Sequence, residues 1–386
     1  MKLLITGDWH YRSQNPVARL DDFQSTLNAK LHEIGQIAYD HDVEAVVAPG
    51  DIFDSPSPAY STLTALERII QDIGRPIWAV PGNHDEHAHS LESLDRTAYG
   101  HLAATGMIRD LAASPAETDT VTVTGTGFST MTDTDVSDYL AKNVPDATEN
   151  SVKIHVAHGM LLEHAPGFEL KHTLLGDVAK HPHCPDVLIC GHEHLGFGVR
   201  RIPRARGGEL VAINPGALVR LSAHPGEIER VPQVCLLEVY PGTAPICPHC
   251  SDGALIPDRN DTAYCSNCRA KFCHVSEGRF AYEYGPPEIW DIGEPVIETK
   301  LIPLVTARPG HEVLSRAHIE QAAEREAKMG QFLSLLSREG EAKFLDLQSI
   351  VEGVAKSENL PREVVDEALS RIAKARETLG GRGRTA

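Results

Sequence analysis

Three polar side chains that could bind a metal or take part in catalysis stand in consecutive positions after a short apolar run. Gly82-Asn83-His84-Asp85 follows the apolar residues 76–80 and Pro81. The apolar run predicts a buried strand, and the tetrapeptide predicts the loop that leaves its carboxyl end. An amide, an imidazole and a carboxylate side by side suit metal ligation and acid chemistry at a phosphate. This interpretation depends on whether other strand ends supply matching ligands.

Four further predicted strands, over residues 2–6, 44–48, 152–157 and 186–190, also lead into metal-binding side chains. Asp8 and His10 follow the first strand and point the same way, because side chains alternate along an extended segment. The other three strands lead to Asp51, to His158, and to His192 with His194. Amphipathic helices predicted over 21–41 and 60–73 alternate with the first strands. The pattern favours an α/β fold with its site at the carboxyl ends of the strands.

The order of these motifs resembles that of the calcineurin-like metallophosphoesterases. The patterns DxH, GDxxD, GNH[DE], H and GHxH all occur, in that order, over about residues 1–220. The stretches Asp8-Trp9-His10, residues 50–58 and Gly191-His192-Glu193-His194 are similar to those of the SbcD-type DNA-repair nucleases. The turn at residues 214–218 looks more like that of general phosphoesterases. The resemblance implies a layered metallophosphoesterase β-sandwich flanked by helices.

The resemblance also implies two active-site metals, with Mn²⁺ as the expected ion. Asp8, His10 and His194 would hold one metal, Asn83, His158 and His192 would hold the other, and Asp51 would bridge them. Two such ions lower the pKa of a shared water and stabilise charge on phosphoryl oxygens. His84 would then stabilise the transition state or protonate the leaving oxygen, and Asp85 would hold its imidazole.

Two features near these motifs leave alternatives open. Arg200, Arg201, Arg204 and Arg206 form a basic run just past His194. The run either contacts a phosphate backbone near the metals or lies on a solvated hairpin. Asp54 either supports the metal site or caps the helix that begins near Pro58, and we expect the cap.

Four of the eight cysteines form two CxxC pairs: Cys247, Cys250, Cys265 and Cys268. Four thiolates in this spacing predict a tetrahedral structural Zn²⁺, against the alternatives of free thiols or a redox pair. We therefore expect a zinc ribbon over 241–285, inserted between a metallophosphoesterase core over 1–240 and a final core strand and linker over 286–310. Metal would supply the folding energy of so small a segment.

Residues 311–386 are expected to be helical, with helices over 313–337, 343–356 and 362–377. Apolar stripes on the last two resemble the helices by which SbcD-like nucleases bind the coiled coil of an SbcC-like ATPase. The alternative is a self-packed cap or a dimerisation element. We expect a homodimer that also contacts DNA and the ATPase.

The composition sets limits on these hypotheses. A net charge of −18 excludes a general nucleic-acid-coating protein, which would be basic. It does not exclude a nuclease, because metal-holding carboxylates count as negative and a partner can supply basic surface. The sequence has no apolar run of membrane-spanning length and no signal peptide at its first residues, so we expect a cytoplasmic protein without membrane contact.

The sequence thus predicts a two-metal phosphodiesterase that acts as a DNA exo- or endonuclease in repair or recombination. The alternative is a stand-alone phosphoesterase acting on a small phosphodiester or a phosphoprotein, which the acidic charge favours. A non-catalytic adaptor is a third class, and the complete ligand set argues against it.

Overall fold

The computed structural model describes residues 1–118, 121–141, 152–166, 170–240, 296–321, 323–324 and 328, and the backbone of four strands between 255 and 282. The side chains of Cys247, Cys250, Cys265 and Cys268 lie outside this part of the chain. So do the helices expected over 343–356 and 362–377, and most of the one expected over 313–337.

The first six-stranded sheet carries the N-terminal strands, in the order β18-β13-β1-β2-β3-β4. Its strands are β1 (Lys2–Ile5), β2 (Ala45–Ala48), β3 (Ile77–Ala79), β4 (Ile108–Asp110), β13 (Gln233–Tyr240) and β18 (Val296–Pro303). The four strands from β1 to β4 run parallel, whereas β13 is antiparallel to both β1 and β18. The carboxyl ends of β1, β2 and β3 therefore meet at one edge.

The second six-stranded sheet has the order β11-β12-β10-β7-β6-β5. Its strands are β5 (Ala116–Glu117), β6 (Val121–Thr126), β7 (Val152–Gly159), β10 (Val187–His192), β11 (Gly198–Pro203) and β12 (Glu209–Asn214). The four central strands are parallel, and the edge strands β5 and β11 are antiparallel to their neighbours. Two predicted strands are longer than expected, so His158 and His192 lie within β7 and β10 rather than after them.

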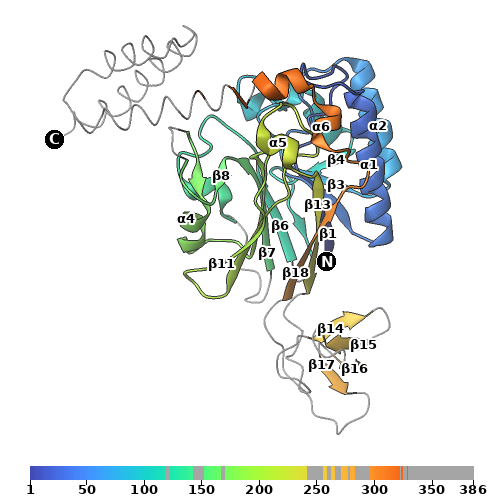
Figure 1. Cartoon of the computed structure of the whole chain (residues 1–386). Coiled ribbons are helices and arrows are strands. Elements are labelled where there is room, and N and C mark those ends of the chain that lie inside the picture. The colour runs from blue at the N-terminus through green and yellow to red at the C-terminus, as the bar shows by residue number, and fades with distance from the viewer. Residues whose placement is uncertain are drawn as a thin grey trace, which may run out of the picture.

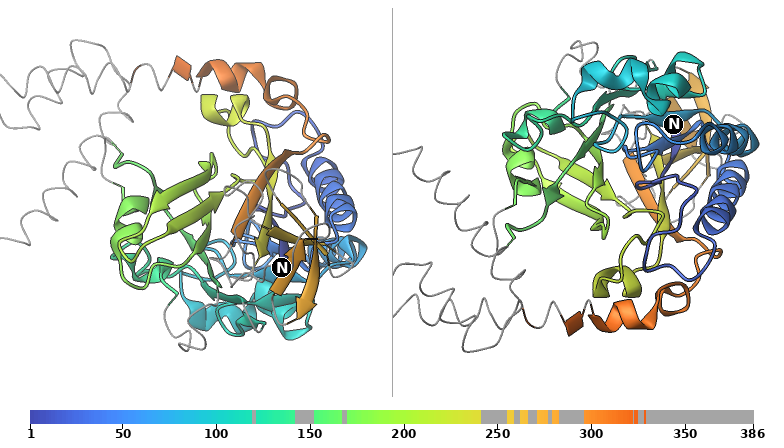
Figure 2. Two further views of the ribbon diagram at one scale, coloured as in Figure 1. Left: turned by 90° about the horizontal axis from the view of Figure 1, so that it is seen from below. Right: turned by 90° about the horizontal axis from the view of Figure 1, so that it is seen from above.

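The two sheets pack face to face, and helices cover their outer faces (Figures 1 and 2). The described part of the chain includes the helices α1 (Phe23–Asp40), α2 (Tyr60–Ile73), η1 (Leu91–Arg96), α3 (Ala98–Ala104), η2 (Val136–Tyr139), α4 (Leu175–Lys180), α5 (Pro225–Glu229) and α6 (Gly310–Val313). Strand β1 shows how the layers arise: Leu3 and Ile5 face the second sheet, whereas Leu4 faces α1. The predicted fold class, a layered α/β sandwich flanked by helices, is confirmed.

Helix α1 forms where the sequence predicts it. The side chain of Asp22 accepts the backbone N–H of Ser25 and caps the first turn. Phe23, Leu27 and Leu31 begin a buried stripe at helical spacing that packs on the first sheet. The helix thereby fixes the strand ends that carry the candidate site.

Two smaller sheets complete the described strands. Strands β8 (Leu161–Leu162) and β9 (Thr173–Leu174) pair in parallel, and β14 (Leu255–Asp258), β15 (Thr262–Cys265), β16 (Lys271–Ser276) and β17 (Arg279–Tyr282) form a four-stranded sheet in chain order. This sheet stands in the sequence between β13 and β18. Within the described part of the chain, no helix combines the length and apolar character needed to cross a membrane.

Candidate metal centre

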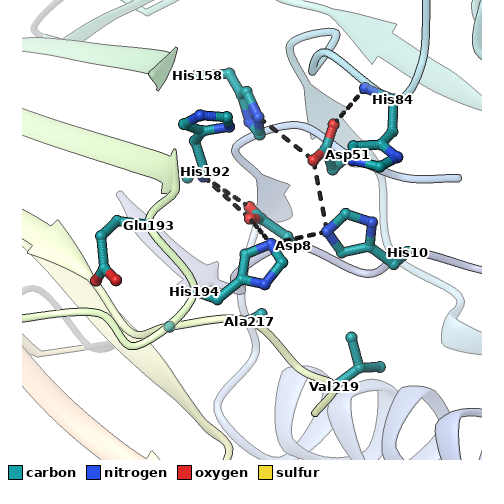
Figure 3. A network of polar contacts seen from close by, with 12 residues as sticks. Asp8, His10, Asp51, His84, His158, His192, Glu193, His194, Ala217 and Val219 are labelled. Carbon is teal, nitrogen blue, oxygen red and sulfur yellow. Dashed lines mark hydrogen bonds and ion pairs between the residues drawn. The ribbon is translucent and has the colours of Figure 1, made fainter. Parts of the chain in front are cut away.

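The predicted ligands gather where the carboxyl ends of the two sheets meet (Figure 3). The first sheet contributes residues after β1, β2 and β3, and the second contributes residues of β7 and β10 and the turn after β10. Candidate ligand atoms of Asp8, His10, Asp51 and His194 lie within 4.8 Å of one another, and those of Asp51, His158 and His192 form a second such group. Asp51 belongs to both groups.

The first group is tightly built. Nε2 of His10 lies 2.9 Å from Nε2 of His194, and Nε2 of His194 lies 3.4 Å from Oδ2 of Asp8. The Asp8 carboxylate also accepts the backbone N–H of His192, at 3.0 Å. The side chain of His10 is only 1 % exposed, and its Nδ1 atom lies 3.5 Å from Oδ1 of Asp54. A carboxylate beside one ring nitrogen orients the imidazole and leaves the other nitrogen, Nε2, to face the centre.

The second group surrounds His158. Nδ1 of His158 lies 2.7 Å from the carbonyl oxygen of Pro49, which fixes the ring and turns Nε2 toward the centre. Nε2 lies 3.1 Å from Oδ1 of Asn83 and 3.5 Å from Oδ2 of Asp51. Because the same Asp51 oxygen is 3.5 Å from Nε2 of His10, one carboxylate atom faces both groups.

Backbone conformation holds three of these side chains in place. His10, Asp51 and His192 have φ angles of 46°, 48° and 83°, in the left-handed region that residues with a Cβ rarely adopt. Strained backbone conformations of this kind are concentrated at functional sites, where contacts with the surrounding structure hold them in place. Gly50, before Asp51, has a φ of 111° and faces the His158 ring, so a side chain at this position would displace the ring.

The electrostatics of the centre favour positive charge. Burial alone would lower the pKa of His158, but the Asp51 carboxylate outweighs it and raises that pKa to about 9. Burial opposes ionisation of Asp51 too, yet His158 and the neighbouring histidines hold the pKa of Asp51 well below its usual range. A pocket that stabilises a buried cation beside a carboxylate suits a divalent metal ion.

The pKa values of His192 and His194 shift downward, opposite to that of His158. Burial, together with the charge of His158, lowers the pKa of His192 to about 3, and burial with the charge of His10 does the same for His194. Both rings are neutral at physiological pH, the state in which imidazole binds metals. The donor set of imidazoles, carboxylates and one amide thus fits divalent transition metals.

His84 lies at the edge of the centre. Its backbone N–H donates to Oδ1 of Asp51 at 2.9 Å, and its ring Nδ1 lies 3.0 Å from the carbonyl oxygen of Asp54. The ring is half-buried and meets the His10 ring at a centroid distance of 4.8 Å. This position brings His84 close to the centre while its side chain is fixed through the loop after β2 (Figure 3).

The expectation that Asp85 holds the His84 imidazole is wrong. The Asp85 carboxylate is fully buried and accepts three backbone N–H groups, from Ile52, Phe53 and Gly82, at 2.9–3.2 Å. These bonds tie the loop after β3 to the loop that carries Asp51. Asp85 therefore shapes the backbone under the ligands, and the sequence could not reveal this because the three donors are main-chain groups.

The expected helix cap at Asp54 is also wrong. Helix α2 begins after Ala59, and no side chain caps it. Asp54 instead pairs with Arg12 at 2.7 Å and lies 3.5 Å from Nδ1 of His10. The sequence signal that could have found this contact is Arg12 itself, two residues after a predicted ligand.

The arginine run lies along β11 and the turn after it, and its guanidinium groups already have partners. Arg200 pairs with Glu163 at 2.6 Å, and Arg201 lies 3.6 Å from Glu209. Arg204 and Arg206 both pair with Asp186, at the opposite end of β10 from His192. Arg204 and Arg206 therefore lie away from the centre, and contact with DNA stays a prediction for all four residues.

Sequence reasoning missed Phe128, which follows β6. Its ring centroid lies 5.5 Å from that of His192 and 6.2 Å from that of His158. The ring walls one side of the second ligand group. A single aromatic residue after a strand carries no motif, so only the packing of β6 beside β7 reveals it.

Comparison with known proteins agrees with this geometry. The chain is 32% identical to the SbcD component of the SbcCD nuclease of Escherichia coli K12 over 102 residues, which cover 26% of this chain and 25% of that protein. It is 34% identical to the Bacillus subtilis SbcD component over 94 residues, which cover 22% of each. It is 27% identical to the DNA double-strand break repair protein Mre11 of Methanosarcina acetivorans over 201 residues, 47% of this chain and 31% of that protein.

These matches span 22–31% of the relatives' own length. Residues 1–196, about half of the chain, match the calcineurin-like phosphoesterase family, whose members use divalent metals. This stretch includes β1 to β10 and all of the candidate ligands. The chain belongs to the calcineurin-like phosphoesterases.

Proposed function

We propose that this protein is a two-metal phosphodiesterase that cleaves DNA. The observation that carries the proposal is the position of Asp51, whose Oδ2 atom lies 3.5 Å from Nε2 of His10 and 3.5 Å from Nε2 of His158. A carboxylate shared between two ligand groups offsets the repulsion between two cations held about 3.5–4 Å apart. Mn²⁺ suits the mixed histidine, amide and carboxylate donors better than Mg²⁺, which prefers oxygen.

Each ligand group has its own task. Asp8, His10 and His194 would hold one ion, and Asn83, His158 and His192 would hold the other. When bound, the ions supply Lewis-acid stabilisation of a phosphoryl group and an activated water. His84 lies at the edge of the two ligand groups and would stabilise the charged transition state or protonate the leaving oxygen, because the contact of its Nδ1 with the Asp54 carbonyl oxygen fixes the ring.

The choice of DNA rests on the relatives. Two are SbcD components of SbcCD nucleases and one is a DNA double-strand break repair protein. We propose on this basis a role in DNA repair or recombination, as a homodimer, with an SbcC-like coiled-coil ATPase bound at residues 311–386. The two CxxC pairs support a structural Zn²⁺ held by Cys247, Cys250, Cys265 and Cys268.

A second candidate is a stand-alone phosphoesterase acting on a small phosphodiester or a phosphoprotein. Two observations favour it. The chain has a net charge of −18, and the arginine run after His194 is engaged in ion pairs with carboxylates. Both features weaken attraction to a phosphate backbone.

The discriminating experiment measures Mn²⁺-dependent cleavage of linear duplex DNA, single-stranded DNA and bis-p-nitrophenyl phosphate by the purified full chain. We expect cleavage of DNA and of the small ester, with both activities abolished in Asp51→Ala. Cleavage of the ester alone, with DNA left intact, would favour the second candidate. Cleavage of none of the three substrates by a protein loaded with metal would overturn the first candidate and the small-phosphodiester form of the second.

A further inference from the structure

Four consecutive backbone carbonyls, at residues 217–220, each accept a hydrogen bond from a cationic side chain. Arg230 donates to the carbonyls of Ala217 and Val219. The ammonium group of Lys30, on α1, donates to the carbonyl of Leu218 at 2.5 Å. Arg19 donates to the carbonyl of Arg220 at 3.3 Å. We call Arg19, Lys30 and Arg230 the cation cradle.

The segment held by the cation cradle also contacts the metal centre. The backbone N–H of Ala217 donates to the carbonyl of His194, and that of Leu218 donates to the carbonyl of Asp8, both at 2.9 Å. Figure 3 shows Ala217 beside His194, with Val219 two residues further along the same segment. The N–H groups of this segment therefore brace two ligands of the first group, while its carbonyls point to the cations.

The fit between these backbones is close. A Cβ on Gly7, next to Asp8, would lie 1.9 Å from the carbonyl oxygen of Gly216. Gly216 itself has a φ of 83°, and a Cβ there would lie 2.9 Å from the carbonyl oxygen of His194. A small displacement of this segment must therefore move the backbone that carries Asp8 or His194.

Burial of the three cationic side chains of the cation cradle is energetically unfavourable. The side chains of Arg19 and Arg230 are only 2 % and 7 % exposed, and Lys30 is 2 % exposed. Burial and repulsion from the neighbouring arginines lower the pKa of Lys30 to about 7. Asp21 balances Arg19, and Glu227 balances Arg230, but no described carboxylate pairs with Lys30. Burying charges is unfavourable unless each finds good partners, and here the partners are mainly carbonyls.

One carboxylate joins the cation cradle to a ligand side chain. Glu227 pairs with Arg230 at 2.9 Å through one oxygen, and its other oxygen lies 3.9 Å from Nδ1 of His194. Glu227 is buried. Arg230 thus acts on His194 along two routes, through the Ala217 backbone and through Glu227.

We propose that the cation cradle positions the first ligand group, Asp8 and His194 in particular, and leaves the second group around His158 largely unaffected. The inference rests on the two-metal site of the proposed function and does not depend on DNA being the substrate. Arg19, Lys30 and Arg230 are positioning residues, since they reach the ligands only through the backbone and Glu227.

The test measures binding of Mn²⁺ to metal-free full-length protein by isothermal titration calorimetry. The variants are Lys30→Met, which removes the donor to Leu218, and Arg230→Lys, which keeps the charge but cannot span two carbonyls. Arg75→Met is the matched control, because Arg75 pairs with Asp42 at the surface, away from the cation cradle. We expect the wild type and the control to bind two ions with the same affinities.

In both cradle variants we expect one Mn²⁺ affinity to fall about tenfold and the other to stay within about twofold. Lys30→Arg, which restores a donor, is expected to recover part of the loss. Urea unfolding confirms that each variant is folded. If Arg230→Lys does not fold, Glu227→Gln tests the same route, with the same expected loss.

Unchanged affinities in folded variants, or an equal loss at both sites, would overturn the positioning role. A wild-type protein that binds no Mn²⁺ would instead overturn the proposed function and, with it, this inference. The two failures are therefore distinguishable in one set of titrations.

Discussion

A Cβ added to Gly50 would lie 2.1 Å from Nδ1 of His158, a distance that no packed structure tolerates. Gly50 precedes the shared ligand Asp51, and its φ of 111° leaves its Cα facing the imidazole. The backbone after β2 and the second ligand group are thus in direct contact, so the glycine of the GDxxD motif has a steric explanation.

Gly50→Ala is expected to destabilise the protein and weaken one metal site. The left-handed conformation alone costs about 1–2 kcal/mol for a residue with a Cβ. Displacement of His158 adds to this and removes a ligand of the second group. Gly106→Ala is the matched control, because Gly106 has a φ of 73° and nothing within 4 Å of its added Cβ. Urea unfolding and Mn²⁺ stoichiometry check the difference. Equal losses in the two variants would contradict the steric explanation.

His84→Ala is expected to keep both metals and lose turnover. A positioned acid–base group contributes roughly 10²–10⁴-fold to the rate, and the ligand groups do not need this side chain. Metal analysis tests whether both metals are retained, and an assay with bis-p-nitrophenyl phosphate tests whether turnover is lost. Asp51→Ala should lose metal as well as activity. Full turnover in His84→Ala with both metals bound would refute the role of His84.

Asp85→Asn is expected to act on stability rather than on the pH dependence of turnover. The amide cannot accept three backbone N–H groups as the carboxylate does, and an unsatisfied buried donor costs about 1–3 kcal/mol. Urea unfolding measures this loss. The pH–rate profile should keep its shape, since the ring of His84 faces the Asp54 carbonyl instead. A displaced profile with unchanged stability would restore the sequence-based role for Asp85.

Stability should rise with pH because of Lys30. Its pKa is about 7 in the folded protein against 10.5 in the unfolded chain, so the unfolded state binds more protons between these values. By linkage, the free energy of unfolding gains about 2 kcal/mol from this group between pH 7 and pH 9. The comparison is between wild type and Lys30→Met, unfolded in urea at both pH values. Between pH 7 and pH 9, the gain in the free energy of unfolding should be about 2 kcal/mol smaller in Lys30→Met than in the wild type. An equal gain in the two proteins would show that folding does not lower the pKa of Lys30.

The sequence by itself predicted the fold class and which residues gather at the candidate site. Apolar runs predicted the central strands, because burial on both faces leaves a local signature that needs no knowledge of neighbours. The ligand types at successive strand ends predicted a shared centre, since parallel strands bring their carboxyl ends to one edge. Asp8 and Asp51 stand together for this reason in the first sheet, as do His158 and His192 in the second.

The tertiary structure alone decided what the remaining polar groups do. Asp85, Asp54 and Lys30 bind partners that are distant in the sequence, several of them main-chain atoms that are the same in every residue. The sequence left two positions open for the arginine run, and the course of β11 brings Arg204 and Arg206 to Asp186, at the opposite end of β10 from His192. Side-chain type predicts which chemistry is possible, whereas the partner depends on the packing of the two sheets and their helices.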